Sequence, residues 1–172
     1  MTEPEVLFEG RLFRVVRAIQ RAADGREHVR EIVRHPGAVT ILPVLDDDRV
    51  CLIENYRIAV DQRLIELPAG TLEPGEDPAQ TARRELAEET GYRAGAIDRL
   101  AVFYMSPGIL DERMHLYLAT SLEPGPMALE GGEQIAPLTA TWQETLEMIR
   151  SGRVQDSKTL VGLLYYNTFH RR

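Results

Sequence analysis

The stretch from Gly70 to Tyr92, GTLEPGEDPAQTARRELAEETGY, constrains the fold of this 172-residue chain more than any other segment. Asp77 is suited to accept hydrogen bonds from the first N–H groups of a helix, and Pro78 suits the first helical turn. Gly91 stands where a residue in the left-handed conformation ends a helix. The stretch therefore predicts a helix that begins after Asp77 and ends before Gly91.

Three carboxylates gather on one side of this helix. At about 100° per residue, Glu85, Glu88 and Glu89 fall within an arc of roughly 100°. The neighbouring arc, which we expect to be buried, consists of Ala79, Ala82, Leu86 and Thr90. Like charges at these spacings destabilise a helix by about 0.2–0.5 kcal/mol per pair. A hard divalent cation at the edge of a cleft would remove that penalty, since it prefers carboxylate, water and phosphate oxygens. When the helix is considered by itself, the alternative interpretation is that these three glutamates form an acidic face exposed to solvent.

The spacing resembles the Nudix box, which consists of a glycine, five residues, Glu, seven residues, Arg-Glu, an aliphatic residue, any residue, Glu-Glu, any residue, Gly and an aliphatic residue. The matching residues are Gly70, Glu76, Arg84, Glu85, Leu86, Glu88, Glu89 and Gly91. Tyr92 is the one departure, at a packing position. The resemblance implies an α/β/α sandwich with a mixed sheet, and hydrolysis of a nucleoside diphosphate linked to another group.

The same resemblance implies roles for individual residues. It implies that Glu85 and Glu89 are the main metal ligands, that Glu88 lies close by, and that the carbonyl of Ala69 is a further ligand. Arg84, together with Glu76, orients the site, and we count Arg84 and Glu88 among the catalytic residues. Divalent ions neutralise a pyrophosphate and activate water. We expect Mg²⁺, and the sequence leaves Mn²⁺ and Zn²⁺ open.

A second resemblance concerns the loop around Ser106-Pro107-Gly108. Pro107 lies 15 residues beyond Tyr92, as in the ADP-ribose pyrophosphatase subfamily, and implies that Pro107 and Gly108 contact substrate. Glu112, in the same loop, resembles the subfamily's loop acid and is our candidate general base. Two alternatives stay open, namely an exposed loop acid paired with Arg113, and a helix glutamate, Glu88 or Glu89, as the base.

Two charged residues precede the box and are candidate substrate contacts. Arg57 is suited to clamp a phosphate or to stack on adenine, unless it simply ends a strand in water. Glu66 precedes the Pro-Ala-Gly turn. We expect it either to bind ribose hydroxyls or to pair with Arg57.

The first 36 residues form a separate unit in our interpretation. Residues 5–34 alternate partly between apolar and polar, which predicts short antiparallel strands. Strands of this kind are marginal alone, and this segment has too few large apolar residues for its own core. We therefore expect residues 1–36 to be a β-element that packs on the main domain or pairs with another chain in a homodimer, and residues 37–172 to be the hydrolase domain.

The remaining chain mixes strands with helices. We expect strands at residues 38–45, 49–56, 63–67, 99–105 and 114–119. Thr141 and Glu144 form a capping-box pattern that predicts a helix ending near Gly152, and a further helix is expected over residues 157–170. This mixture predicts an α/β sandwich rather than a regular parallel sheet. The acidic stretch Glu130–Glu133 is interpreted as a solvated turn.

The overall charge and the hydropathy pattern disfavour several classes of partner and location. A net charge of −7 and a pI of about 5.2 disfavour a nucleic-acid binder, which usually needs a basic face. No apolar run approaches the roughly 20 residues that span a bilayer, and the acidic N-terminus lacks a signal-peptide pattern. We expect a cytoplasmic protein that acts on a small nucleotide sugar.

The resemblances together predict metal-dependent hydrolysis of ADP-ribose to AMP and ribose 5-phosphate. One alternative is another nucleotide-sugar pyrophosphatase, acting on GDP-mannose or ADP-glucose. The alternative from another class is a binding module that senses ADP-ribose without cleaving it. Such modules usually lose box glutamates, and all of them are present here.

Overall fold

The computed structural model describes residues 4–129 and 131–171. Along the chain the elements are β1 (Glu5–Glu9), β2 (Arg14–Arg21), β3 (Glu27–Arg34), β4 (Ala38–Pro43), β5 (Arg49–Arg57), β6 (Gln62–Glu66), β7 (Ala69–Thr71), α1 (Pro78–Thr90), β8 (Tyr92–Tyr104), β9 (Arg113–Pro124), β10 (Ile135–Thr141), α2 (Trp142–Arg150) and α3 (Ser157–Phe169). No helix among the described residues is long and apolar enough to cross a membrane.

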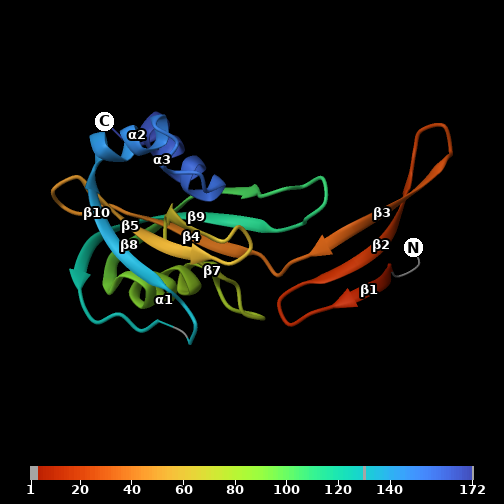
Figure 1. Ribbon diagram of the computed structural model, residues 1–172, viewed down its shortest axis with the longest axis horizontal. Helices are drawn as coiled ribbons and strands as arrows, with labels where there is room; N and C mark the ends of the chain where they lie inside the picture. The colour runs from red at the N-terminus through yellow and green to blue at the C-terminus, as the bar shows by residue number, and fades with distance from the viewer. Residues whose placement is uncertain (1–3, 130, 172) are drawn as a thin grey trace.

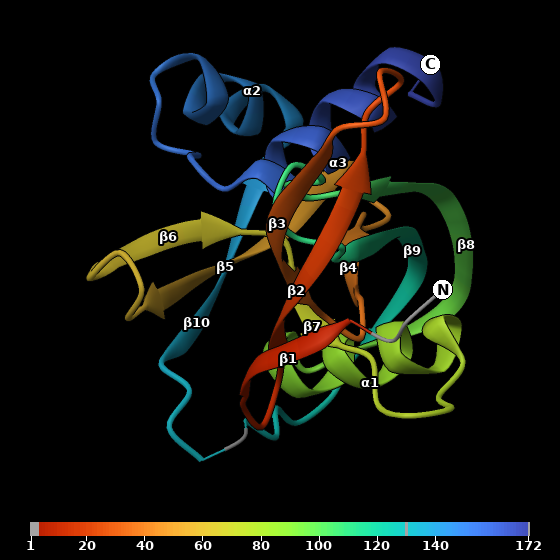
Figure 2. The same cartoon turned by 90° about the vertical axis from the view of Figure 1, so that its right-hand side faces the viewer.

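The body of the molecule is a three-layer sandwich. Its two sheets have the strand orders β7-β4-β9-β8 and β10-β5-β6. Helix α1 covers one side, and α2 and α3 cover the other (Figures 1 and 2). β4 pairs in parallel with β9, whereas its other neighbour, β7, is antiparallel. The predicted α/β/α sandwich with a mixed sheet is confirmed.

Strand β4 is at the centre of the core because it is buried along its whole length. Val39 and Ile41 pack with Ala82 and Leu86 of α1 in one apolar cluster. Leu42 belongs to a second cluster, which includes residues of α2 and α3. Each buried Leu or Ile stabilises the fold by about 1.5–3 kcal/mol relative to an exposed one. This double burial fixes α1 against the sheet, and with it the segment that carries the acidic residues.

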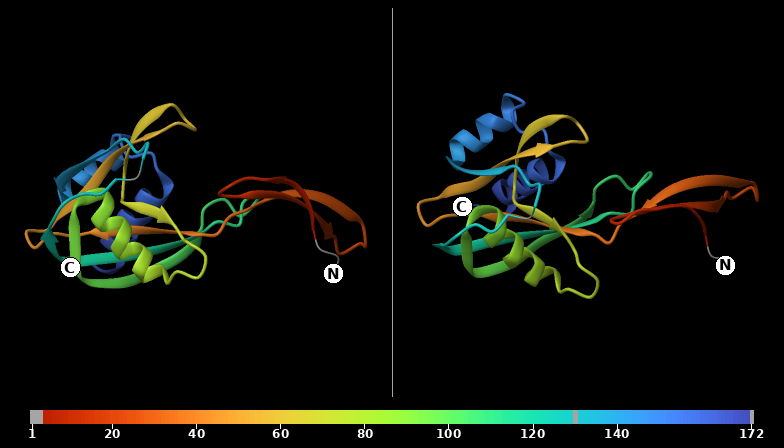
Figure 3. Two further views of the ribbon diagram at one scale, coloured as in Figure 1. Left: turned by 90° about the horizontal axis from the view of Figure 1, so that it is seen from below. Right: turned by 60° about the horizontal axis from the view of Figure 1, so that its bottom comes forward.

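The N-terminal strands form a separate sheet, β1-β2-β3, that projects from the body (Figures 1 and 3). Its apolar side chains are largely exposed, and they include Val6, Phe8, Ile19 and Val29. The sheet is attached to the body near Val33, whose N–H donates to the carbonyl of Ile109 at 2.8 Å. The small N-terminal antiparallel β-element is confirmed.

The predicted helices are present. The Asp77 side chain accepts a hydrogen bond from the N–H of Ala79, and Gly91 ends α1 at φ 74° in the left-handed region. Thr141 and Glu144 form the capping box of α2. Helix α3 ends at Phe169, one residue before the predicted end.

Two strand predictions were too short. β8 and β9 extend to 13 and 12 residues, because they pair antiparallel along most of their length. A register shift between Arg99 and Ala101 separates the first half of β8 from the part that the sequence predicted. β7 was not predicted, and it places Ala69 and Gly70 beside Thr40 and Val39 of β4.

Candidate active site

The acidic face of α1 turns toward β7. Ala82 and Leu86 are fully buried against the sheet, so the adjacent arc that carries Glu85 and Glu89 points along the sheet surface. A Cβ added to Gly70 would lie 1.9 Å from Cδ of Glu85. The strand and the glutamate can approach this closely only because residue 70 has no side chain.

Glu89 is the most deeply buried acid of the Nudix-like box. Its side chain accepts a hydrogen bond from the N–H of Ala69 at 2.9 Å, and the residue is 3% exposed. Burial raises the pKa of Glu89 to about 8, with a further contribution from the nearby Glu85 and Glu133. The N–H of Ala69 and the charge of Arg57 lower this pKa, but they do not outweigh the effect of burial.

Arg84 holds the outer carboxylates together. Its Nη1 donates to Glu85 at 2.8 Å and to Glu88 at 3.0 Å, and its Nη2 lies 3.3 Å from Glu76. Burial nevertheless raises the pKa of Glu85 above its ordinary value, despite the neighbouring guanidinium. The structure therefore brings together the box residues that the sequence singled out.

The donor set fits a divalent cation. Glu85, Glu89 and the backbone of Ala69 line one cavity, and they supply the hard oxygen donors that such ions prefer. Within the described part of the chain, no three acidic, His or Cys side chains already stand in metal-binding geometry. Arg84 holds oxygens of Glu85 and Glu88, and these would have to turn toward an ion.

The cavity has a volume of about 670 Å³, which is within the size range of small-molecule sites. Arg57 also lines it, and so do Arg11 and Leu12 from the turn between β1 and β2. Glu133 is exposed and follows a turn at residues 131–132, as the sequence predicted, and in addition it lines the cavity; Glu130, from the same stretch, lies outside the described residues.

Arg57 and Glu66 form a bidentate ion pair. Nε of Arg57 donates to Oε1 of Glu66 at 2.8 Å, and its Nη2 donates to Oε2 at 2.7 Å. The Glu66 side chain is 1% exposed, and Lys158 donates to it from α3. Of the two alternatives for Glu66, the structure shows the pair with Arg57. No local sequence pattern indicated Lys158.

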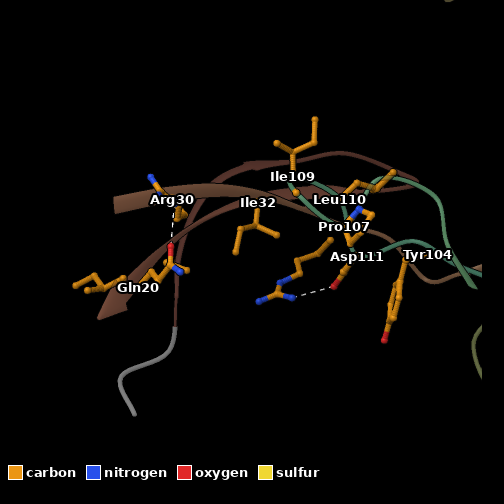
Figure 4. Close-up of a pocket in the computed structure, with 12 residues that line it drawn as sticks. Gln20, Arg30, Ile32, Tyr104, Pro107, Ile109, Leu110 and Asp111 are labelled. Atoms are coloured by element: carbon orange, nitrogen blue, oxygen red, sulfur yellow. Dashed lines mark hydrogen bonds and ion pairs between the residues drawn. The ribbon is translucent and has the colours of Figure 1, made fainter. Parts of the chain in front are cut away.

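The loop residues lie elsewhere. Pro107 and Gly108 line a different cavity, of about 630 Å³, together with Ile19 and Ile32 of the N-terminal sheet (Figure 4). Oε1 of Glu112 lies 3.8 Å from Nδ1 of His35. The structure does not place these three loop residues in the lining of the cavity that holds the box glutamates.

Asp111 fastens this loop to the N-terminal sheet. Its carboxylate accepts from Nη1 of Arg34 at 2.9 Å (Figure 4) and from the N–H of His35 at 2.8 Å. Burial would raise the pKa of Asp111, but the bonds from Arg34 and His35 hold it below its usual value. The loop is thus fixed to the end of β3 in this conformation.

A family model described as "NUDIX domain" matches residues 34–158. The chain is 39% identical over 163 residues to a methanol dehydrogenase activator of Bacillus methanolicus, covering 94% of this chain and 88% of that protein. It is 36% identical, with the same coverages, to an ADP-ribose pyrophosphatase of Bacillus subtilis. A GDP-mannose pyrophosphatase of Salmonella typhimurium is 35% identical over 83% of this chain and 80% of the relative.

A solved structure described as an ADP compounds hydrolase has a similar fold. It superposes with a TM-score of 0.82 at 22% identity, covering 98% of this chain and 95% of that one.

Proposed function

Because the chain belongs to the Nudix hydrolase family, we propose that it hydrolyses the pyrophosphate bond of ADP-ribose to give AMP and ribose 5-phosphate. The observation that carries the proposal is one cavity that the box carboxylates Glu85 and Glu89 line together with Arg57. The name of the Bacillus subtilis relative supports this substrate. Nudix hydrolases are generally dependent on divalent metals, and the substrate class is a small nucleotide sugar.

We propose Mg²⁺ as the metal, with Glu85, Glu89 and the Ala69 carbonyl as ligands and Glu88 close by. A bound divalent ion supplies charge neutralisation of the pyrophosphate and a water of lowered pKa. Arg84 orients the carboxylates, as its hydrogen bonds to Glu85 and Glu88 suggest. Since the pyrophosphate is anionic, Arg57 attracts it to the part of the cavity wall that this residue lines.

Glu112 is our candidate general base, and Glu88 and Glu89 are its rivals. Glu112 takes this role only if its loop leaves His35 and moves over the cavity, with Pro107 and Gly108 approaching the substrate. Replacement of Glu112 by Gln separates the candidates. A fall in kcat of about 10²–10⁴-fold supports Glu112 as the base, whereas a change of less than threefold assigns the role to the helix.

We further propose that residues 1–36 join two copies of the chain in a homodimer. The exposed apolar side chains of Phe8, Ile19 and Val29 support this, because monomers rarely expose large contiguous apolar patches. Light scattering tests it directly. A dimeric mass supports the proposal, and a monomeric mass at micromolar concentration contradicts it.

The substrate is tested by AMP release from ADP-ribose with Mg²⁺, beside GDP-mannose and ADP-glucose at equal concentration. We expect fast cleavage of ADP-ribose that collapses in Glu85→Gln. Preferred cleavage of GDP-mannose would favour the alternative suggested by the Salmonella relative. Binding of ADP-ribose without turnover would instead favour a sensing module, which the intact set of box glutamates argues against.

A further inference from the structure

A buried cation stands behind Arg57. Lys158, at the start of α3, is 6% exposed, and its Nζ lies 2.5 Å from Oε2 of Glu66. The same oxygen accepts from Nη2 of Arg57 at 2.7 Å. Asp156 completes the network, with Oδ1 at 3.0 Å from Nζ of Lys158.

Lys158 is not needed to attach or cap α3. Thr159 performs both tasks, since its N–H and hydroxyl donate to the second oxygen of Asp156 and its Oγ1 accepts from the N–H of Leu67 at 2.8 Å. Burying an ammonium group costs several kcal/mol before any partner offsets it. The contacts that offset this cost are those with Glu66 and Asp156, and of these two acids only Glu66 is also bonded to Arg57.

Arg57 has two acidic neighbours that compete for it. Its side chain is 42% exposed and lies at the wall of the cavity that Glu89 also lines. Pairing with Glu66 uses the Nε–H and one Nη2–H, which leaves three N–H donors of the guanidinium for an anion. A guanidinium drawn onto Glu89 would instead approach the proposed metal ligands.

We propose that Lys158 is a positioning residue for substrate binding, which acts through Glu66 to hold the guanidinium of Arg57 at the cavity wall, where it meets a phosphate of the nucleotide. This inference rests on the proposed function only in its choice of substrate. The fixed fork geometry of Arg suits such a task, because small errors in angle weaken phosphate contacts.

The test is a double-mutant cycle of Lys158→Met, Arg57→Ala and both together. We expect Lys158→Met to raise the KM for ADP-ribose about tenfold with kcat changed less than threefold, the pattern of lost ground-state binding. In the Arg57→Ala background, the same change should have no further effect on KM. Lys158→Arg, which keeps the charge, should restore most of the affinity.

The matched control is Asn167→Leu on the same helix, which removes the bond from Nε1 of Trp142 to Asn167. It should lower Tm without raising KM. A Lys158→Met effect that persists in the Arg57→Ala background overturns the proposal, because Lys158 would then act on the fold alone. Should Lys158→Met not fold, Lys158→Gln replaces it in the same cycle.

Binding of ADP, followed by calorimetry in all four proteins, separates the two proposals. Wild type that binds ADP but leaves ADP-ribose intact contradicts the proposed function, and the cycle is then judged on the Kd for ADP, with the same tenfold expectation. Wild type that binds no ADP overturns both.

Discussion

Glu66 and Glu89 are both buried carboxylates that attract Arg57, yet their charge environments are opposite. Burial alone would raise the pKa of Glu66, but Arg57 and Lys158 outweigh it and hold this pKa below its usual value. Burial raises the pKa of Glu89 to about 8. Glu66 is ion-paired with Arg57 and Lys158, whereas Arg57 and the N–H of Ala69 offset the burial of Glu89 only in part. The first arrangement stabilises the fold, and the second suits a metal site.

The largest effect is expected on kcat, from a substitution among the box carboxylates beside Glu89. Glu85→Gln should lower kcat at least about 100-fold, since even outer-shell changes cost 10–100-fold at metal sites. Its Tm without metal should stay the same or rise, because a poorly balanced buried charge disappears. Steady-state kinetics and thermal unfolding measure the two effects. A lowered Tm would mean that the box carboxylates are structural in the way that Glu66 is.

Glu66→Gln, in contrast to Glu85→Gln, should lower the stability of the fold. It removes one of the two negative partners of Lys158 and leaves only Asp156, and breaking a buried ion pair costs about 3–5 kcal/mol. Urea unfolding at pH 7 measures the loss. A decrease of less than about 1 kcal/mol in the free energy of unfolding would contradict a stabilising role for Glu66, because its ion pairs would then contribute no more than a surface pair does.

Gly70→Ala tests the closeness of β7 and the acidic helix. The added Cβ would overlap Glu85, so we expect a loss of about 1–3 kcal/mol from overpacking and a fall in kcat as Glu85 is displaced. Gly131→Ala is the matched control, since a Cβ there meets no atom within 4 Å. Wild-type kcat in Gly70→Ala would show that the position of Glu85 is unimportant.

The pH dependence of stability should show the contribution of Glu66. The pKa of Glu66 in the folded protein lies below its unfolded value, so its contribution is complete above the unfolded pKa of about 4.3 and is lost as pH falls through the folded pKa. Wild type should therefore lose more stability than Glu66→Gln between pH 6 and pH 3. Urea unfolding across that range measures it, and parallel curves for the two proteins would refute the assignment.

Local patterns made one part of this molecule predictable. Asp77 and Gly91 cap α1, and Glu85 and Glu89 lie within it. Caps and periodicity were sufficient to place these residues on one helix, and the resemblance to the Nudix box implied the role of the two glutamates. The Glu66–Lys158 pair joins residues 92 positions apart, and no local pattern marks such a contact.

Other parts depended on the fold for different reasons. Glu133 lies in a Gly-rich loop that reads as solvent-exposed, and only tertiary structure brings it to the cavity. The first half of β8 was missed because residues 92–98 include only two large apolar side chains, Tyr92 and Ile97. The role of Glu112 stays a prediction, since its loop is fixed to the N-terminal sheet here.

The most direct test of the account is a Mg²⁺ titration followed by thermal unfolding of wild type, Glu89→Gln and Lys158→Met. Ligand at 100 times its Kd stabilises by about 2.7 kcal/mol. The account predicts this gain for wild type and for Lys158→Met, and its loss in Glu89→Gln. An equal gain in all three proteins would show that the ion binds elsewhere and would contradict the assignment of the carboxylates of α1 as the metal site.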